Sequence, residues 1–162
     1  MEASKTSAVS ESLIEQLDRA WDILMESVEG FSEEEWRSGP DYQLVPARLV
    51  HHVIETAEFH TRPSAEEFVW GDCFGEELET VDPVALANRG ETLEYMKLVR
   101  RQVKSWIKKL GDEGLKSPDP SFICPGTYHL DRALYLLRHI QHHVGELSAE
   151  LKRRGHSRPT WK

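Results

Sequence analysis

Apolar residues recur every three or four positions along four stretches of this chain, a spacing typical of amphipathic helices. The stretches cover residues 10–30, 46–61, 89–110 and 127–155. In chain order the predicted buried stripes are Ile14, Leu17, Trp21, Leu24 and Val28; Leu49, Val50, Val53, Ile54 and Ala57; Thr92, Met96, Val99, Val103, Ile107 and Leu110; and Ala133, Leu137, Ile140, Val144, Leu147 and Leu151. The pattern therefore predicts four helices, each with one face toward a common core.

Helix-starting and helix-ending residues agree with these limits. Pro46 suits the first turn of a helix, where its missing N–H is not needed. Ser32 and Glu35 have the spacing of a capping box and predict a short turn in the first connector. Gly111 is expected to end the third helix, and Gly155 is expected to end the fourth.

The connectors between the predicted helices are long. Residues 64–70 are expected to add a short helical piece, residues 71–83 form a predicted loop, and three prolines in residues 112–126 exclude a continuous helix there. No stretch alternates with period two for long enough to predict a strand. We expect an all-α four-helix bundle forming a single domain over residues 1–162, with residues 1–8 disordered.

Composition narrows the classes of function. Charged residues make up 30% of the 162 residues, and the formal net charge is −8. An acidic balance argues against a nucleic-acid partner and against docking on anionic membranes. There is no apolar run of membrane-spanning length and no apolar signal core, so a cytoplasmic protein acting on a small molecule is expected. Cys73 and Cys124 are too few for a disulfide framework, and free thiols are expected.

The most informative polar residues are histidines. His139 and His143 lie four positions apart on one flank of the last apolar stripe, so one face of the helix carries both. Two imidazoles at this spacing can hold one divalent metal ion. The alternative is a pair of hydrogen-bonded histidines at the edge of the core. His142 points toward solvent on the helical wheel and is set aside.

A third ligand would come from the second helix. His51 and His52 are adjacent, so only one of them can face the same site, and His60 lies nearer the apolar stripe than either. The helical wheel alone leaves the choice among these three open.

The run LVHHVIETAE at residues 49–58 and the run HIQHHVGEL at residues 139–147 together resemble the DinB/YfiT-like superfamily of metal-binding four-helix bundles. The second run follows that family's H-x3-H-x-G-Q-L pattern, with Glu146 where Gln is commoner. The resemblance implies that His52, His139 and His143 are the metal ligands. Tyr42 departs from the pattern because a Trp commonly precedes the second helix, and residues 70–84 form a longer loop than in many relatives.

Three neutral imidazoles leave a coordination position open, which is the arrangement of a catalytic metal site. All-nitrogen ligation fits Zn²⁺, Ni²⁺ or Fe²⁺. Glu55, Glu146 and Tyr135 are candidates to orient the imidazoles.

Members of the resembling family include S-transferases that use low-molecular-weight thiols, a thiol-requiring maleylpyruvate isomerase and metal-dependent hydrolases. The resemblance therefore implies a metal-dependent enzyme for thiol transfer or hydrolysis of a small molecule, with a low-molecular-weight thiol as a candidate cofactor. The alternative is a non-catalytic bundle in which a metal links two helices, acting as a stress-related binding protein or a homodimeric scaffold. In a third reading the histidines belong to a plain helical scaffold.

Overall fold

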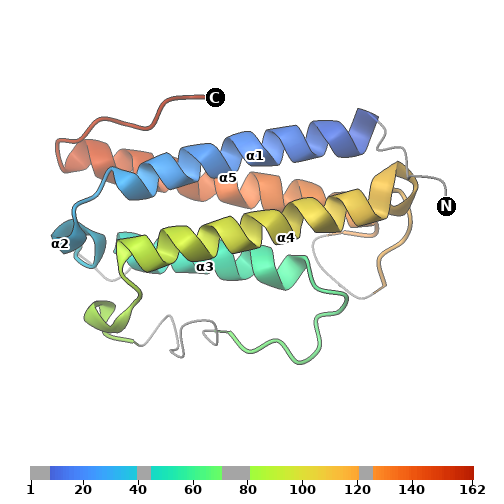
Figure 1. Ribbon diagram of the computed structural model, residues 1–162, viewed down its shortest axis with the longest axis horizontal. Helices are drawn as coiled ribbons and strands as arrows, with labels where there is room; N and C mark the ends of the chain where they lie inside the picture. Colours follow the sequence, from blue (N-terminus) through green and yellow to red (C-terminus); the bar gives the residue numbers. More distant parts are fainter. Residues whose placement is uncertain (1–7, 40–44, 71–80, 121–125) are drawn as a thin grey trace.

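Four long helices lie side by side in the computed structural model, which describes residues 8–39, 45–70, 81–120 and 126–162 (Figure 1). They are α1 (Ala8–Glu29), α3 (Pro46–His60), α4 (Arg89–Leu115) and α5 (His129–Arg153). The connectors add the short helix α2 (Glu33–Trp36) and the 3-10 turn η3 (Pro83–Ala85). The described residues contain no strand, and the prediction of an all-α bundle is confirmed.

The arrangement of the helices follows from their contacts. α1 packs mainly against α4 and α5, and α3 packs against the same two helices. α1 and α3 therefore occupy diagonal corners of the bundle, with α4 and α5 between them (Figure 1).

The predicted stripes form the core. Nearly all of their residues are buried, and Leu49, Leu110 and Leu137 are partly buried against the others. In α5, Leu136 is fully buried, whereas its neighbour Leu137, the predicted core residue, is only partly buried. Trp21 and Trp36 are at most 1% exposed, which makes them core anchors.

Three predicted helix boundaries are confirmed. Pro46 is the first residue of α3, and Ser32 and Glu35 form a capping box at α2 in which each side chain accepts from the other residue's backbone N–H. Gly155 follows α5 with a φ of +86°, a left-handed conformation that glycine adopts without a Cβ clash. The next amide, that of His156, then donates to the Leu151 carbonyl over 2.9 Å.

Gly111 does not end the third long helix, contrary to the sequence-based prediction. Its φ of 58° and ψ of −176° produce a kink, after which α4 continues for one more turn to Leu115. Two contacts favour this continuation. Leu115 is fully buried, and the Asp112 carboxylate accepts hydrogen bonds from the backbone N–H groups of Val9 and Ser10 in α1 at 3.3 and 2.8 Å. The loop predicted to begin at Asp112 therefore begins after Leu115.

The predicted helical piece over residues 64–70 is also wrong. These residues form turns and irregular backbone, and Glu67 has a φ of 60°, which a right-handed helix cannot include. Phe68 and Trp70 instead fold back against Phe59 of α3. Packing of aromatic rings, rather than helical hydrogen bonding, determines the path of this segment.

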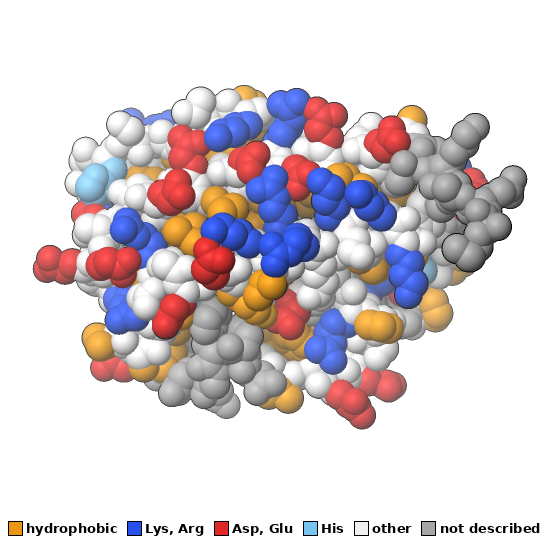
Figure 2. All heavy atoms as spheres, in the orientation of Figure 1, with side chains coloured by type: hydrophobic (Ala, Val, Ile, Leu, Met, Phe, Trp, Pro, Cys, Tyr) orange, Lys and Arg blue, Asp and Glu red, His pale blue; other side chains and the backbone are white. Residues whose placement is uncertain are grey.

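Ion pairs join the outer faces of α1 and α4. The Arg100 guanidinium donates to Asp18 over 2.8 Å and to Asp22 over 2.6 Å, and Lys104 contacts Asp18 over 2.8 Å. Figure 2 shows this face, where basic side chains gather near the centre and acidic side chains lie around them.

Some sequence-based expectations lie outside the described residues, namely those for residues 1–7, Tyr42, Cys73 and Cys124. Ala8, which was expected to be disordered, already belongs to α1. None of the helices in the described part of the chain combines the length and apolar character needed to span a membrane.

Candidate metal centre

Two adjacent helices bring three imidazoles together. His52 comes from α3, and His139 and His143 come from successive turns of α5. The Nε2 atom of His139 lies 3.1 Å from Nε2 of His52 and 3.1 Å from Nε2 of His143. One ring nitrogen from each residue falls within 4.8 Å of the other two. The structure thus places the three predicted residues in one group, which we call the three-His cluster.

The cluster sits at the edge of the α3–α5 interface. His143 is 9% exposed, His139 is half-buried and His52 is exposed. Val53 of α3 and Val144 of α5, the chain neighbours of two cluster residues, are buried in the core. The cluster therefore borders the core at His143, which is buried, and is open to solvent at His52.

The distances fit a shared cation better than hydrogen bonds alone. A ring nitrogen of a neutral imidazole carries either one proton or one lone pair, so Nε2 of His139 can make only one of its two short contacts as a hydrogen bond. Two nitrogens bound to one tetrahedral zinc ion lie about 3.3 Å apart, given a Zn–N distance of about 2.0–2.1 Å. The two observed separations of 3.1 Å are close to that value. The donor set and its spacing are therefore compatible with one divalent metal ion.

Glu146 contacts the outer nitrogen of His143. Its Oε2 atom lies 2.6 Å from Nδ1 of His143, so that nitrogen carries the proton and donates it to the carboxylate. The lone pair of His143 is then on Nε2, which faces His139. An imidazole held in this tautomer is ready to act as a ligand.

Burial keeps two imidazoles of the cluster neutral. It lowers the pKa of His139 to about 3, with a further contribution from the neighbouring His143 and His52. Burial also lowers the pKa of His143, although Glu146 opposes the shift. Tyr135 stacks on His139 with ring centroids 5.6 Å apart and planes inclined by 23°, and covers one side of that imidazole.

The competing histidines of α3 lie elsewhere. His51 is fully buried with Nε2 3.4 Å from Thr92 Oγ1 of α4, and burial lowers its pKa to about 4. His60 is 7% exposed and packs against Phe59 and Tyr135, with ring centroids 5.0 and 4.8 Å away. Neither belongs to the three-His cluster. Of the other residues considered as orienting groups, Glu55 is buried in α3.

The sequence analysis missed a second group. His142, whose side chain is 67% exposed as expected, has a ring nitrogen 3.9 Å from Glu146. Together with a ring nitrogen of His143, these residues also meet the spacing for a metal ion. The helical spacing of His142, His143 and Glu146 could have indicated it. Because Glu146 already accepts the proton on Nδ1 of His143, we assign this group to orienting His143.

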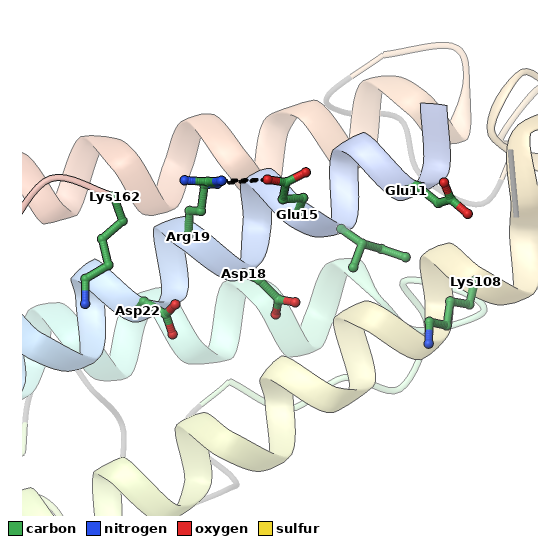
Figure 3. Close-up of a pocket in the computed structure, with 8 residues that line it drawn as sticks. Glu11, Glu15, Asp18, Arg19, Asp22, Lys108 and Lys162 are labelled. Atoms are coloured by element: carbon green, nitrogen blue, oxygen red, sulfur yellow. Dashed lines mark hydrogen bonds and ion pairs between the residues drawn. The ribbon is translucent and has the colours of Figure 1, made fainter. Parts of the chain in front are cut away.

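A groove of about 620 Å³ lies on a different part of the molecule. Charged residues of α1, together with Lys108 of α4 and Lys162 at the C-terminus, line it (Figure 3). No histidine lines this groove, and Asp18 within it is already paired with Arg100 and Lys104. The groove is therefore not part of the three-His cluster.

Comparison with known proteins agrees with the resemblance seen in the sequence. The sequence model of the DinB superfamily matches residues 16–147, well over half of the chain. The matched segment includes all three residues of the cluster. A search of curated protein sequences returned no significant match. The chain belongs to the DinB superfamily.

Proposed function

We propose that this protein is a metal-dependent enzyme in which His52, His139 and His143 hold one divalent cation. The observation that carries the proposal is the convergence of three imidazole nitrogens from two helices within 4.8 Å. Zn²⁺, Ni²⁺ and Fe²⁺ all accept such a donor set.

The surrounding residues perform defined tasks in this proposal. Glu146 holds the proton of His143 on Nδ1 and thereby directs its lone pair inward. Tyr135 covers one side of His139, and the exposed position of His52 leaves an approach for a small molecule. A divalent ion bound to three neutral imidazoles would act as a Lewis acid that lowers the pKa of a bound water or thiol.

Two reaction classes use this chemistry. In the first, the sulfur of a low-molecular-weight thiol forms a C–S bond with an electrophilic carbon, the leaving group departs with its electron pair, and the thiol proton passes to solvent. In the second, water hydrolyses a small ester or amide. Membership of the DinB superfamily supports both classes.

Metal analysis tests the site itself. Protein purified without a histidine tag should contain about one equivalent of divalent metal, and the double variant His139→Ala/His143→Ala should contain none. His142→Ala, a variant of the exposed neighbour, should keep its metal. Equal metal in the wild type and the double variant would rule out the three-His cluster. Loss of metal in His142→Ala would move the site to the second group.

A pair of assays separates the two reactions. Metal-loaded protein is incubated with cysteine and 1-chloro-2,4-dinitrobenzene for thiol transfer, and with p-nitrophenyl acetate for hydrolysis. Turnover above that of the double variant assigns the class. A rate equal to that of the double variant in both assays would favour the second candidate function.

That second candidate is a non-catalytic bundle in which the metal links helices. The observation that favours it is the origin of the cluster, since one ligand comes from α3 and two come from α5. A metal bound there would connect two helices that are separated by 68 residues of chain, from His60 to His129. Its test is the melting temperature of the protein with and without the metal.

A further inference from the structure

A continuous row of rings leads away from the three-His cluster. Tyr135 stacks on His139, and the next ring, His60, lies 4.8 Å from Tyr135. Phe59 then lies 5.0 Å from His60. Because Phe59 follows His52 by seven residues, it lies on the same face of α3, about 10 Å further along the helix axis.

The row ends in three rings that contact one another. Phe59, Phe68 and Trp70 have centroids 5.2, 5.1 and 4.9 Å apart. Trp70 remains 49% exposed and its neighbour Val69 is 63% exposed. We call Phe59, Phe68 and Trp70 the aromatic cluster. An exposed group of contacting apolar side chains is a feature of ligand-binding and protein-binding surfaces.

Two guanidinium groups lie over rings of this row, one at the aromatic cluster and one beside the three-His cluster. Arg62 lies over Phe68, 5.3 Å from the ring centre, and Arg138 lies over Tyr135 at 5.5 Å. Among residues 8–39, 45–70, 81–120 and 126–162, neither guanidinium pairs with a carboxylate. A planar cation beside an aromatic ring is suited to recognise a flat anionic group such as a carboxylate.

The backbone before the aromatic cluster is strained. Glu67 adopts a φ of 60°, a left-handed conformation that is unfavourable for a residue with a Cβ atom. The turn it makes brings Phe68 and Trp70 back onto Phe59. Strain of this kind persists where the surrounding structure holds it, and it is concentrated at binding sites.

We propose that the aromatic cluster binds the non-reacting part of the substrate, and that the substrate is an aromatic carboxylate. Its ring packs on Trp70 and Phe68, its carboxylate meets Arg138, and its reactive end points toward the three-His cluster. The spacing of about 10 Å along α3 requires a molecule at least as long as a two-ring acid. This inference rests on the proposed function, because it names the substrate class of the same site.

The test uses 2-naphthoate as the probe and NMR of metal-loaded, full-length protein. The indole N–H signal of Trp70 is assigned with the variant Trp70→Phe. Cyclohexanecarboxylate, an anion without an aromatic ring, and 2-naphthalenemethanol, a neutral aromatic compound, are the ligand controls. Trp161→Ala, at a tryptophan that is 78% exposed, and Arg101→Gln, on the exposed face of α4, are the protein controls.

We expect 2-naphthoate to shift the Trp70 signal saturably and more strongly than either control compound. Trp70→Ala and Arg138→Gln should each weaken binding about fivefold or more, while the two control variants bind as the wild type does. Both positions are exposed, so the variants should retain the wild-type circular dichroism spectrum. The inference is overturned if Trp70 does not respond, or if neither substitution weakens binding.

Metal analysis of the same samples separates this inference from the proposed function. Metal in the wild type without 2-naphthoate binding would overturn the substrate class alone. Binding of 2-naphthoate to wild-type protein without metal would overturn the proposed enzyme and leave an aromatic-acid site.

Discussion

Glu146 determines which nitrogen of His143 carries its proton. The 2.6 Å contact between Glu146 and Nδ1 is available because the two residues are three positions apart on α5, on neighbouring turns. The cluster therefore depends on a residue that offers no atom to the three-His group itself. A carboxylate in this position also favours a cationic centre electrostatically.

The first prediction concerns this contact. Glu146→Ala should weaken metal binding about tenfold to a hundredfold, because His143 then loses the group that holds its tautomer. Glu146→Gln should lose less, since an amide oxygen can still accept from Nδ1. Competition against a coloured chelator measures both affinities.

Glu113→Ala is the matched control, because the Glu113 side chain is 93% exposed on α4. The role of Glu146 is contradicted if Glu146→Ala binds metal as tightly as Glu113→Ala does.

Only two of the three residues of the three-His cluster could be predicted from helical spacing. The His139–His143 pair follows from helical spacing alone. The third member did not, because His51, His52 and His60 all lie near the stripe of α3. The structure separates them by packing, since His51 enters the core beside Thr92 while His60 packs on Tyr135. That difference depends on neighbouring helices, which a wheel of one helix does not include.

At the scale of helices, hydrophobic periodicity predicted the four long helices, whereas a single helix-breaking residue misplaced the end of one of them. A glycine after an apolar stripe usually ends a helix, yet Gly111 only bends α4. The turn beyond it is retained by burial of Leu115 and by hydrogen bonds from α1 to Asp112. Both contacts join segments distant in sequence, so a local pattern could not indicate them.

The end of α5 is tied to the first connector by charged side chains. Glu150 pairs with Arg153 and Arg154 of its own helix. The Arg154 guanidinium continues to the carbonyls of Glu35 and Ser38, over 2.8 and 2.6 Å. These hydrogen bonds hold the last turn of α5 against α2.

The second prediction follows from the carboxylates of this region. Hydrogen bonds from Arg153 and, to a smaller extent, Arg154 lower the pKa of Glu150 to about 2. Hydrogen bonds from the Ser32 amide and, to a smaller extent, His156 lower the pKa of Glu35 to about 2. Both folded-state pKa values lie below those of the same carboxylates in the unfolded chain. The stability that the two carboxylates contribute is therefore fully present above about pH 5 and is lost as the pH falls toward 2. We expect a loss of about 2 kcal/mol after allowance for solvent screening.

Urea unfolding at a series of pH values measures this loss. The double variant Glu35→Gln/Glu150→Gln should be less stable at pH 7 and should show a smaller decrease on acidification. An acid dependence equal to that of the wild type would show that other carboxylates account for it.

At the scale of the whole molecule, the bundle has its core and its candidate centre in different places. The apolar stripes of all four long helices fill the centre, whereas the three-His cluster lies at the outer edge of the α3–α5 contact. The all-α architecture was predictable because it depends on periodicity summed over many residues. The pairing of α3 with α5 came from the family resemblance, which linked histidines on both helices.

The third prediction is the response of the bundle to a chelator. A ligand that binds only the native state stabilises it by about 2.7 kcal/mol at a hundredfold excess over its dissociation constant. For a chain of this length that corresponds to a melting temperature about 5–10 °C lower after metal removal. Differential scanning calorimetry with and without EDTA measures the shift.

The variant His139→Ala/His143→Ala should show no shift with EDTA. A large shift without any turnover would favour the helix-linking role over the catalytic one. Equal EDTA sensitivity in the wild type and the variant would contradict metal binding at these residues.

The kink at Gly111 also has a consequence for the hydrogen exchange of the first amides of α1. The first amide groups of a helix ordinarily fray, because no earlier carbonyl can accept from them. In this protein those of Val9 and Ser10 donate to Asp112, about a hundred residues away and directly after the kink. Protection of these amides against hydrogen exchange therefore requires α4 to be docked on α1 and bent at Gly111, so a local opening of the last turn of α4 exposes the amides of Val9 and Ser10 as well.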